Sequence, residues 1–347
     1  MEPERRPASL RPEAGASEPL FFLVGPTASG KSELALELAE RAGAEILSLD
    51  SMLVYRGMDV GTAKPARELR RRVPHHLIDL VGPEESFGVQ DYRAAAHAAL
   101  EDVRSRGRRA LFVGGTAFYL KALTHGLFEG PQVDPDLRAR IEARVHGEGS
   151  EASHAELARV DPASASRIHA NDTKRLVRAL EVWEQTGRTL SSWQREWGWH
   201  AGAAGAPGRA RRIVGLALPA AELERRIAER TRRMLDEGWV EEARSIRSGA
   251  GFGETSIQAL GYEQVLKLAD GELTRAACER EIVVRTRQFA RRQRTWFRGF
   301  RELVWLDASR AAEGSAEVAR GTAGAPATKD LAARAGEVFG WTLGESR

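Results

Sequence analysis

The sequence predicts an α/β protein in which a parallel-sheet core with flanking helices is interrupted by an all-helical insertion. Short apolar segments alternate with helical segments before residue 123 and again after residue 210, a spacing typical of parallel strands with crossover helices. Residues 135–197 contain helical patterns only. A glycine-rich loop directly after the first apolar segment indicates that the sheet belongs to a P-loop core.

The elements of the first part follow from apolar runs bounded by turn residues. Strands are expected at residues 20–24, 45–49 and 109–113, with a short one at 77–81. Helices are expected at 33–41, at the alanine-rich stretch 91–106, and from Thr116 onward. A long polar loop, "YRGMDVGTAKP", follows the second strand.

The remaining elements are mostly helical. Asp172 is a plausible N-cap of its helix, and Gly187 follows that helix. The Gly/Ala stretch 201–210 reads as a linker. The helices are expected at 136–145, 154–160, 172–185, 221–235, 240–246, 258–268 and 273–298. Strands are expected at 213–218 and 303–306, and a further helix is expected near Leu331.

This pattern divides the chain into five segments. We expect a disordered tail at 1–19, the first part of the core at 20–122, the helical insertion at 123–209, the second part of the core at 210–308, and a flexible tail at 309–347.

Composition excludes several classes. The 347 residues include one cysteine, Cys278, which excludes an internal disulfide and a cysteine-clustered zinc site and fits a reducing cytoplasm. No apolar run reaches the length of a membrane span, and residues 1–18 lack the apolar core of a secretory signal. We therefore expect a cytoplasmic protein without membrane association. We also expect a monomer, although the sequence does not fix the oligomeric state.

Positive charge is concentrated in "VVRTRQFARRQRTWFRGFR", which runs from Val283 to Arg301 without one acidic residue. Arginine interleaved with aromatic residues, here Phe289, Trp296 and Phe297, favours a nucleic-acid surface, because guanidinium groups bind phosphates and rings stack on bases. The alternative is a solvated helix face whose aromatic residues belong to the core.

The segment "GPTASGKS" matches the phosphate-binding loop G-x-x-x-x-G-K-[ST] between a strand and a helix. Its backbone N–H groups and the helix N-terminus attract a diphosphate, Lys31 reaches a phosphate oxygen, and Ser32 can bind Mg²⁺. The predicted phosphate-binding residues are Gly25, Pro26, Thr27, Ala28, Ser29, Gly30, Lys31 and Ser32.

Two acids, Asp50 and Asp79, lie at expected strand ends. Asp50 should lie at the carboxyl edge of the sheet, where ligands bind, and could hold a metal or accept a proton. Alternatively, Asp50 is the N-cap of a helix beginning at Ser51. For Asp79 a turn or cap role is favoured.

Seven motifs resemble, in this order, those of the tRNA dimethylallyltransferases: "GPTASGKSELALELA", "LDSMLVYRGMDVGTAKP", "LFVGGTAFYLKAL", "ANDTKRLVRALEV", "RIAERTRRML", "QALGYE" and "TRQFARRQRTWF". The resemblance covers Phe21 to Leu306. It implies transfer of a dimethylallyl group from dimethylallyl diphosphate to N6 of adenosine 37 in tRNA. By this resemblance Asp50 accepts the N6 proton, Thr27 and Arg230 assist departure of the diphosphate, and Ser32 helps to place Mg²⁺.

The resemblance also implies a set of tRNA contacts, with the helical insertion as a mobile arm. Among them, Thr116 could instead cap its helix, and "KRLVRAL" is also an ordinary amphipathic pattern. The implied contacts are Asp50, Ser51, Met52, Leu53, Thr116, Arg138, Lys174, Arg175, Leu176, Val177, Arg178, Gln258, Gly261, Tyr262, Arg291, Arg292, Gln293, Arg294, Thr295, Trp296 and Arg298.

Some positions depart from the family pattern, and two other functions stay open. Glu263 stands where the family is usually basic, and Ser32 where threonine is more usual; residues 197–212 follow no family pattern. The P-loop, with Asp79 as a metal acid, would also suit a small-molecule kinase or nucleotide hydrolase. The basic helix would also suit a non-catalytic RNA-binding protein.

Overall fold

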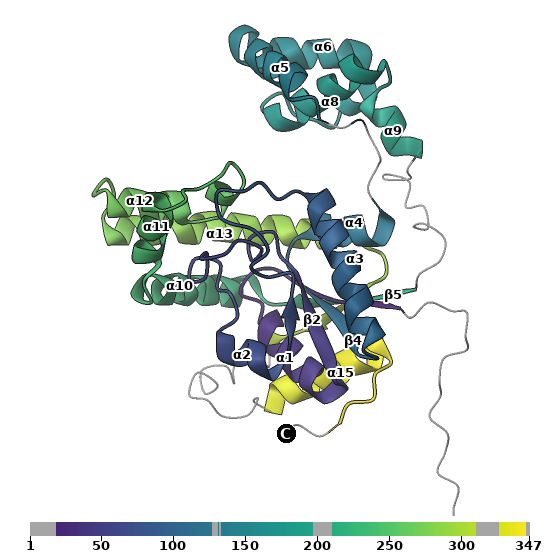
Figure 1. Cartoon of the computed structure of the whole chain (residues 1–347), viewed down its shortest axis with the longest axis vertical. Coiled ribbons are helices and arrows are strands. Elements are labelled where there is room, and N and C mark those ends of the chain that lie inside the picture. Colours follow the sequence, from purple (N-terminus) through teal and green to yellow (C-terminus); the bar gives the residue numbers. More distant parts are fainter. Residues whose placement is uncertain (1–18, 127–130, 132, 197–209, 310–325, 345–347) are drawn as a thin grey trace, which may run out of the picture. The chain divides into compact units, whose positions relative to one another are not determined.

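The computed structural model describes residues 19–126, 131, 133–196, 210–309 and 326–344, and its ribbon is shown in Figure 1. These residues form two compact units, one made of the described residues up to 121 and from 210 onward and the other of those between 122 and 196. Within the described ranges no helix is both long and apolar enough to cross a membrane.

The first unit is built on a six-stranded sheet in the order β3-β2-β4-β1-β5-β6. Every neighbouring pair is parallel, which confirms the predicted fold class. Val24 of β1 and Leu49 of β2 both pair with Gly114 of β4, so three strands end at the same level. The strands are β1 (Leu20–Val24), β2 (Ala44–Leu49), β3 (His75–His76), β4 (Arg109–Gly114), β5 (Arg211–Ala217) and β6 (Leu303–Asp307).

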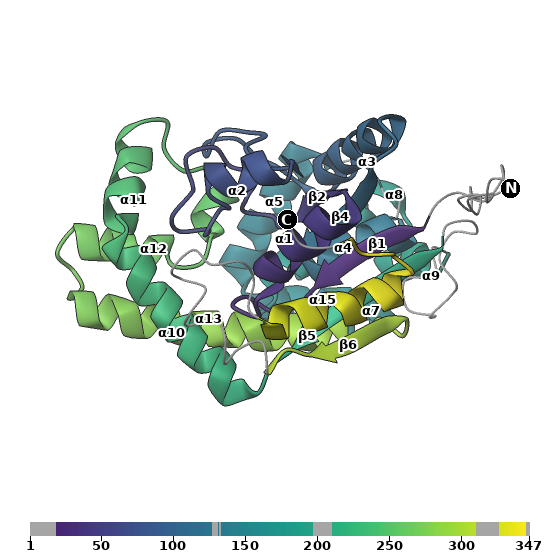
Figure 2. The ribbon, with the colours of Figure 1, turned by 90° about the horizontal axis from the view of Figure 1, so that it is seen from below.

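The helices of this unit cover the sheet and extend beyond one end of it. Figure 2 shows α10 to α13 gathered there, and α10 packs on α13 while α11 packs on α12. The helices are α1 (Lys31–Ala42), α2 (Arg67–Arg72), α3 (Val89–Ser105), α4 (Ala117–His125), α10 (Ala220–Asp236), α11 (Trp239–Ser248), the 3₁₀ turn η1 (Ser256–Gln258), α12 (Tyr262–Ala269), α13 (Arg275–Phe297) and α15 (Pro326–Phe339).

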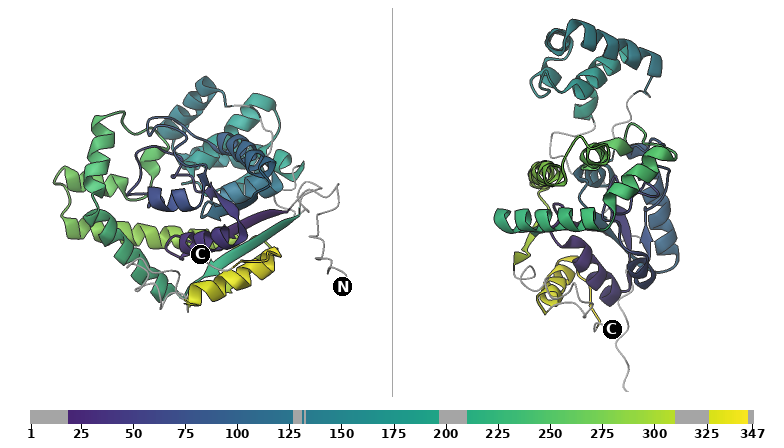
Figure 3. Two further views of the ribbon diagram at one scale, coloured as in Figure 1. Left: turned by 60° about the horizontal axis from the view of Figure 1, so that its bottom comes forward. Right: turned by 90° about the vertical axis from the view of Figure 1, so that its left-hand side faces the viewer.

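The main core lies between one face of the sheet and the helices α1 and α15. Alternate strand residues such as Phe21, Leu23 and Val113 pack there on Leu34 and Leu38 of α1, as the period of two in a strand requires. The yellow helix α15 lies beside β5 in Figure 3, and the two are in contact.

The flexible-tail prediction for 309–347 is therefore wrong over residues 326–344. Leu331, Phe339 and Trp341 are buried in the core, and the helix expected near Leu331 is present as α15. The remaining residues of that segment except Ser309, the 1–19 tail except Pro19, and the 201–210 linker except Ala210 lie outside the described residues.

Two other elements differ from the prediction. The strand expected at 77–81 is absent, because Leu77 and Asp79 have φ angles of 62° and 58°; the short strand β3 precedes them. The helix expected at 258–268 begins at Tyr262, because Gly261 takes a φ of 101° and ends the preceding turn.

The second unit is a helical bundle with a core of its own. Leu137, Ile141, Leu157, Leu176 and Leu180 are buried at its centre. Asp172 caps α8 through the N–H of Arg175, and Gly187 ends that helix with a φ of 67°. Its helices are α5 (Pro135–Glu148), α6 (Ser150–Val160), α7 (Pro162–Ala165), α8 (Thr173–Thr186) and α9 (Leu190–Glu196).

Candidate active site

The phosphate-binding loop joins β1 to α1 at the carboxyl edge of the sheet. The loop backbone is turned by positive φ angles at Ala28 (62°) and Gly30 (87°), and α1 begins at Lys31. The N-terminus of α1 therefore points its unpaired N–H groups toward this edge, which favours an anion.

Two cations lie at the loop with neutral partners. The Lys31 ammonium donates to the carbonyl of Pro26 at 3.3 Å. The Arg230 guanidinium, from α10, donates to Thr27 Oγ1 at 3.3 Å and to the carbonyl of Thr62 at 3.4 Å. Burial, and then repulsion from Arg230, lower the pKa of Lys31 to about 8, while burial lowers the pKa of Arg230. An anion bound between these two cations would offset both their burial and their mutual repulsion, and so would stabilise their charged forms.

Asp50 follows β2 at the same edge, and its charge acts on both Lys31 and Arg230. Its Oδ1 accepts from the N–H of Met52 at 2.9 Å in a local turn. No helix begins at Ser51 in this described stretch, so the helix N-cap alternative for Asp50 is wrong. The Thr116 hydroxyl accepts from the N–H of Ser51 at 3.1 Å, which joins the two loops that follow β2 and β4.

A cavity of about 910 Å³ opens at these side chains. Its lining includes the charged side chains of Lys31, Asp50 and Arg230 and the apolar side chains of Met234 and Phe289. Fourteen of the sequence-predicted residues line it: Thr27, Ala28, Lys31, Ser32, Asp50, Ser51, Met52, Leu53, Thr116, Arg230, Gln258, Gly261, Arg292 and Gln293. A single cavity thus offers an anion site, a carboxylate and an apolar wall.

The basic helix α13 carries an exposed polar face. Trp296 is 41% exposed, and the Arg292 guanidinium lies 5.9 Å from the centre of the Phe289 ring. The predicted contacts exposed on this helix are Arg291, Arg292, Thr295, Trp296 and Arg298, with Arg294 half-buried. Arginines with the exposed rings of Phe289 and Trp296 thus form the expected surface, which reaches the cavity at Arg292, whereas Phe297 is fully buried and belongs to the core.

Two residues predicted to contact tRNA have other roles in the described structure. Gln293 is buried; its Oε1 accepts from the N–H of Thr27 and its Nε2 donates to the carbonyl of Gly115, both at 2.9 Å. Tyr262 is fully buried, and its hydroxyl donates to Glu242 at 2.6 Å. Both side chains are occupied within the protein, so their assignment as tRNA contacts needs correction.

Among the residues of the helical unit that were predicted to contact tRNA, some are buried or paired within the protein and others are exposed. Leu176 and Val177 belong to the core of the bundle and offer no exposed side chain, which corrects their assignment. Arg138 and Arg178 each donate to the buried Glu181 at 2.8 Å. Lys174 and Arg175 are exposed.

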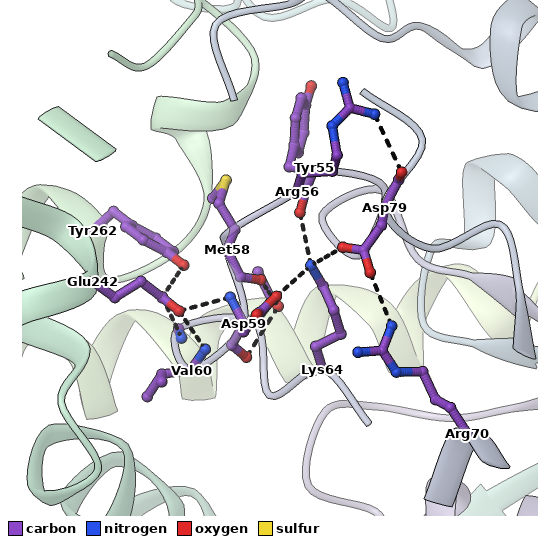
Figure 4. Close-up of polar contacts among 12 residues, drawn as sticks. Tyr55, Arg56, Met58, Asp59, Val60, Lys64, Arg70, Asp79, Glu242 and Tyr262 are labelled. Atoms are coloured by element: carbon purple, nitrogen blue, oxygen red, sulfur yellow. Dashed lines mark hydrogen bonds and ion pairs between the residues drawn. The ribbon is translucent and has the colours of Figure 1, made fainter. Parts of the chain in front are cut away.

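Asp79, the acid that could have served a kinase, is already paired. It accepts from Lys64 at 2.6 Å and from Arg70 at 2.9 Å, and these cations hold its pKa below the usual value against the effect of burial. Figure 4 shows this network beside the loop that carries Lys64. Asp79 is thus part of an ion-pair network and not a metal acid of the site.

Sequence reasoning missed Thr62 and Glu242. The carbonyl of Thr62 accepts from Arg230, and Glu242 on α11 accepts from three backbone N–H groups of the loop around Thr62. No pattern marks Glu242, because "VEEAR" reads as an ordinary solvated helix face.

The site offers few protein ligands for a metal. Across the described ranges no group of three or more His, Cys, Asp or Glu side chains could hold a metal ion. The exposed Ser32 opens α1 and lines the cavity, so a Mg²⁺ ion held mainly by substrate phosphates would find one protein hydroxyl there.

Comparison with known proteins identifies relatives over most of the chain. The family model described as IPP transferase matches residues 53–300, and one described as isopentenyl transferase matches residues 18–79. The tRNA dimethylallyltransferase of Geobacter metallireducens is 47% identical over 290 residues, which cover 83% of this chain and 92% of that protein. The protein of the same name from Methylococcus capsulatus is 48% identical over 291 residues, with the same coverage.

A solved structure is similar to this chain over nearly its whole length. The tRNA isopentenylpyrophosphate transferase of Bacillus halodurans superposes with a TM-score of 0.62 at 34% identity, covering 93% of this chain and 98% of that one.

Proposed function

The chain belongs to the IPP transferase family, and on that premise we propose that it transfers a dimethylallyl group from dimethylallyl diphosphate to N6 of adenosine 37 in tRNA. It is a prenyltransferase that acts on tRNA. The donor, the acceptor atom and the roles of individual residues are the proposed part.

One observation carries this proposal. Lys31 and Arg230 face one cavity with neutral hydrogen-bond partners, and the Asp50 carboxylate lies at the same end. A diphosphate would satisfy the two cations and the N–H groups of the loop. The carboxylate beside it would serve a nucleophile that must lose a proton.

The reaction follows from these positions. The exocyclic N6 of adenine attacks C1 of the dimethylallyl group, the C1–O bond breaks, and the diphosphate leaves. Asp50 accepts the N6 proton as the N–C bond forms, because N6 is a poor nucleophile while its lone pair is delocalised. Arg230, Thr27 and Lys31 stabilise the charge that develops on the leaving oxygen.

Mg²⁺, held by Ser32 and diphosphate oxygens, would supply further positive charge at the leaving group. The protein itself would exclude water from the reacting groups. The apolar wall at Met234 and Phe289 suits the hydrocarbon part of the donor.

The acceptor base must leave its stack to reach the cavity. We propose that Ser51, Met52, Leu53 and Thr116 surround it there, and that the exposed face of α13 binds the phosphates and bases beside it. The helical unit, with exposed Lys174 and Arg175, would bind the anticodon stem as a separate arm.

We further propose that the protein acts as a monomer in the cytoplasm. The single cysteine suits a reducing compartment.

The test is single-turnover transfer of labelled dimethylallyl diphosphate, with Mg²⁺, to an anticodon stem–loop with adenosines at positions 36 to 38. The label should appear on N6 of adenosine 37, and Asp50→Asn should slow the transfer by about a hundredfold or more. Asp330→Asn, the same change at an exposed position on α15, is the control and should transfer at the parent rate.

Transfer that survives Asp50→Asn would leave the reaction in place but remove Asp50 as the base. If the parent protein transferred no label and consumed ATP instead, the P-loop kinase would become the favoured function. RNA binding without either reaction would favour a non-catalytic RNA-binding protein.

A further inference from the structure

The loop of residues 58–65, which we call the GTAK loop, is bound by a single carboxylate. Glu242 Oε2 accepts from the N–H groups of Asp59 at 2.7 Å and Val60 at 2.6 Å. Its Oε1 accepts from the N–H of Gly61 at 2.9 Å and from the Tyr262 hydroxyl at 2.6 Å. Figure 4 shows these four bonds converging from the loop and from α12. Glu242 therefore satisfies three successive backbone donors that would otherwise require water.

The loop is also pressed against α11 and α12. A Cβ at Gly61 would lie 2.1 Å from Trp239 Nε1 and 2.6 Å from the Tyr262 ring, so only glycine allows this approach. Burial and the neighbouring Glu242 raise the pKa of Tyr262, which keeps its hydroxyl protonated as a donor. The conformation at Gly61 thus depends on the contacts around Glu242.

The far end of the loop is anchored as well. The Lys64 side chain is 1% exposed; its ammonium donates to the carbonyl of Tyr55 at 2.8 Å and pairs with Asp59 and Asp79 at 2.6 Å. The Thr62 hydroxyl donates to the carbonyl of Met58 at 2.5 Å. Between these anchors the position of the Thr62 carbonyl is well determined.

That carbonyl meets a residue of the active site. Arg230 Nη2 donates to it at 3.4 Å, and Nη1 of the same guanidinium donates to Thr27 Oγ1 at 3.3 Å. Gly61, Thr62, Ala63 and Pro65 all line the cavity. A guanidinium is planar, so two acceptors on two loops orient it and leave its remaining N–H groups for an anion.

We propose that Glu242 is a positioning residue for the transfer: by holding the GTAK loop it places the Thr62 carbonyl so that Arg230 is aimed at the diphosphate. This inference rests on the proposed function, since it assigns the anion to the Arg230 end of the cavity. Glu242 lines no part of that cavity and acts through the loop and Arg230.

Glu242→Gln tests the proposal with almost no change in shape. An amide keeps one acceptor oxygen and turns an NH₂ group toward backbone donors, so the loop loses at least one of its three bonds to residue 242. Glu241→Gln is the matched control, because it removes the same charge at the neighbouring exposed position of α11. The readouts are binding of inorganic diphosphate, binding of the anticodon stem–loop, and kcat and KM for transfer.

Glu242→Gln is expected to weaken binding of inorganic diphosphate about tenfold and to lower kcat/KM for dimethylallyl diphosphate by a similar factor, with stem–loop affinity changed less than about twofold. In an Arg230→Gln background the same change should add less than about twofold, because its effect passes through Arg230. Glu241→Gln should behave as the parent in every readout.

Parent-like diphosphate affinity in Glu242→Gln would overturn the proposal, as would a full tenfold effect in the Arg230→Gln background. If Glu242→Gln does not fold, Tyr262→Phe carries the test: about threefold weaker diphosphate binding supports the proposal and unchanged binding overturns it. Diphosphate binding is measured without RNA, so a parent that binds diphosphate but transfers nothing would refute the proposed function and leave this test intact.

Discussion

Gln293, on the basic helix, is hydrogen-bonded to Thr27 in the phosphate-binding loop: its Oε1 accepts from the Thr27 N–H at 2.9 Å. Its Nε2 donates to the carbonyl of Gly115 at 2.9 Å, so one amide joins the loops after β1 and β4. A Cβ at Gly115 would lie 2.3 Å from that Nε2, which shows how closely the amide is held. The helix that carries the proposed RNA-binding face is thus bonded directly to the loop that would hold the diphosphate.

Gln293→Leu should weaken both the fold and the site. The substitution leaves the part-buried N–H of Thr27 and the buried carbonyl of Gly115 without this partner, at a cost of about 1–3 kcal/mol in the free energy of unfolding. Urea unfolding and inorganic diphosphate binding are the measurements, and affinity should fall about tenfold. Gln90→Leu, at an exposed position in α3, is the control and should change neither. Parent-like stability and affinity would show that the bridge has no energetic importance.

Lys31→Met should stabilise the free protein while abolishing diphosphate binding. The folded pKa of about 8 lies below the usual 10.5, so the unfolded chain binds more protons between these values. The penalty for charged Lys31 is fully present below pH 8 and is lost as pH rises to 10.5. Removing the charge should add about 1 kcal/mol of stability at pH 7. A less stable Lys31→Met variant would contradict this; Lys329→Met, exposed on α15, is the control.

Diphosphate affinity should fall with increasing pH above about 8. Lys31 must be protonated to attract the anion, and the free protein loses that proton with a pKa of about 8. Bound diphosphate raises the pKa of Lys31, so binding at pH 8.5 should take up protons. Calorimetry in two buffers of different ionisation enthalpy measures this uptake. Equal binding enthalpies in the two buffers would exclude Lys31 as the titrating group.

The exposed arginines of α13 should contribute affinity for RNA through its phosphates. Replacing Arg291 and Arg298 together by Gln should weaken stem–loop binding and reduce the slope of log K against log salt by about 0.7 for each lost contact. Arg280→Gln, on the same helix but away from the cavity, is the control and should leave the slope unchanged. Equal slopes for all three proteins would place the RNA elsewhere.

Much of the α/β core was predictable because its strands are apolar runs that end in recognisable loops. Asp50 was found by its place after β2, whereas Arg230 entered only through the family resemblance. Gln293 enters the predicted RNA contacts through the family resemblance. Its spacing from Ala290 and Phe297, three and four residues away, places all three on one buried helix face, and that signal was available.

Other features could not be found in the sequence. Glu242 binds backbone N–H groups of a loop about 180 residues away, and no periodicity encodes such a contact. The helix near Leu331 was expected, but its place in the core was not, because its apolar face packs on a sheet whose strands lie far away in the sequence.

Trp341→Ala should therefore cost far more than its place near the end of the chain suggests. The centre of its ring lies 4.8 Å from that of Phe21 on β1. The ring of Phe339 also packs on Phe21, with the two centres 5.6 Å apart. Trp341 is 7% exposed, so truncation should lower the free energy of unfolding by about 3–5 kcal/mol in urea titrations. Trp296→Ala, at a ring that is 41% exposed, should cost less than about 1 kcal/mol. Equal small losses would mean that the segment after α15 contributes little to the core that supports the phosphate-binding loop.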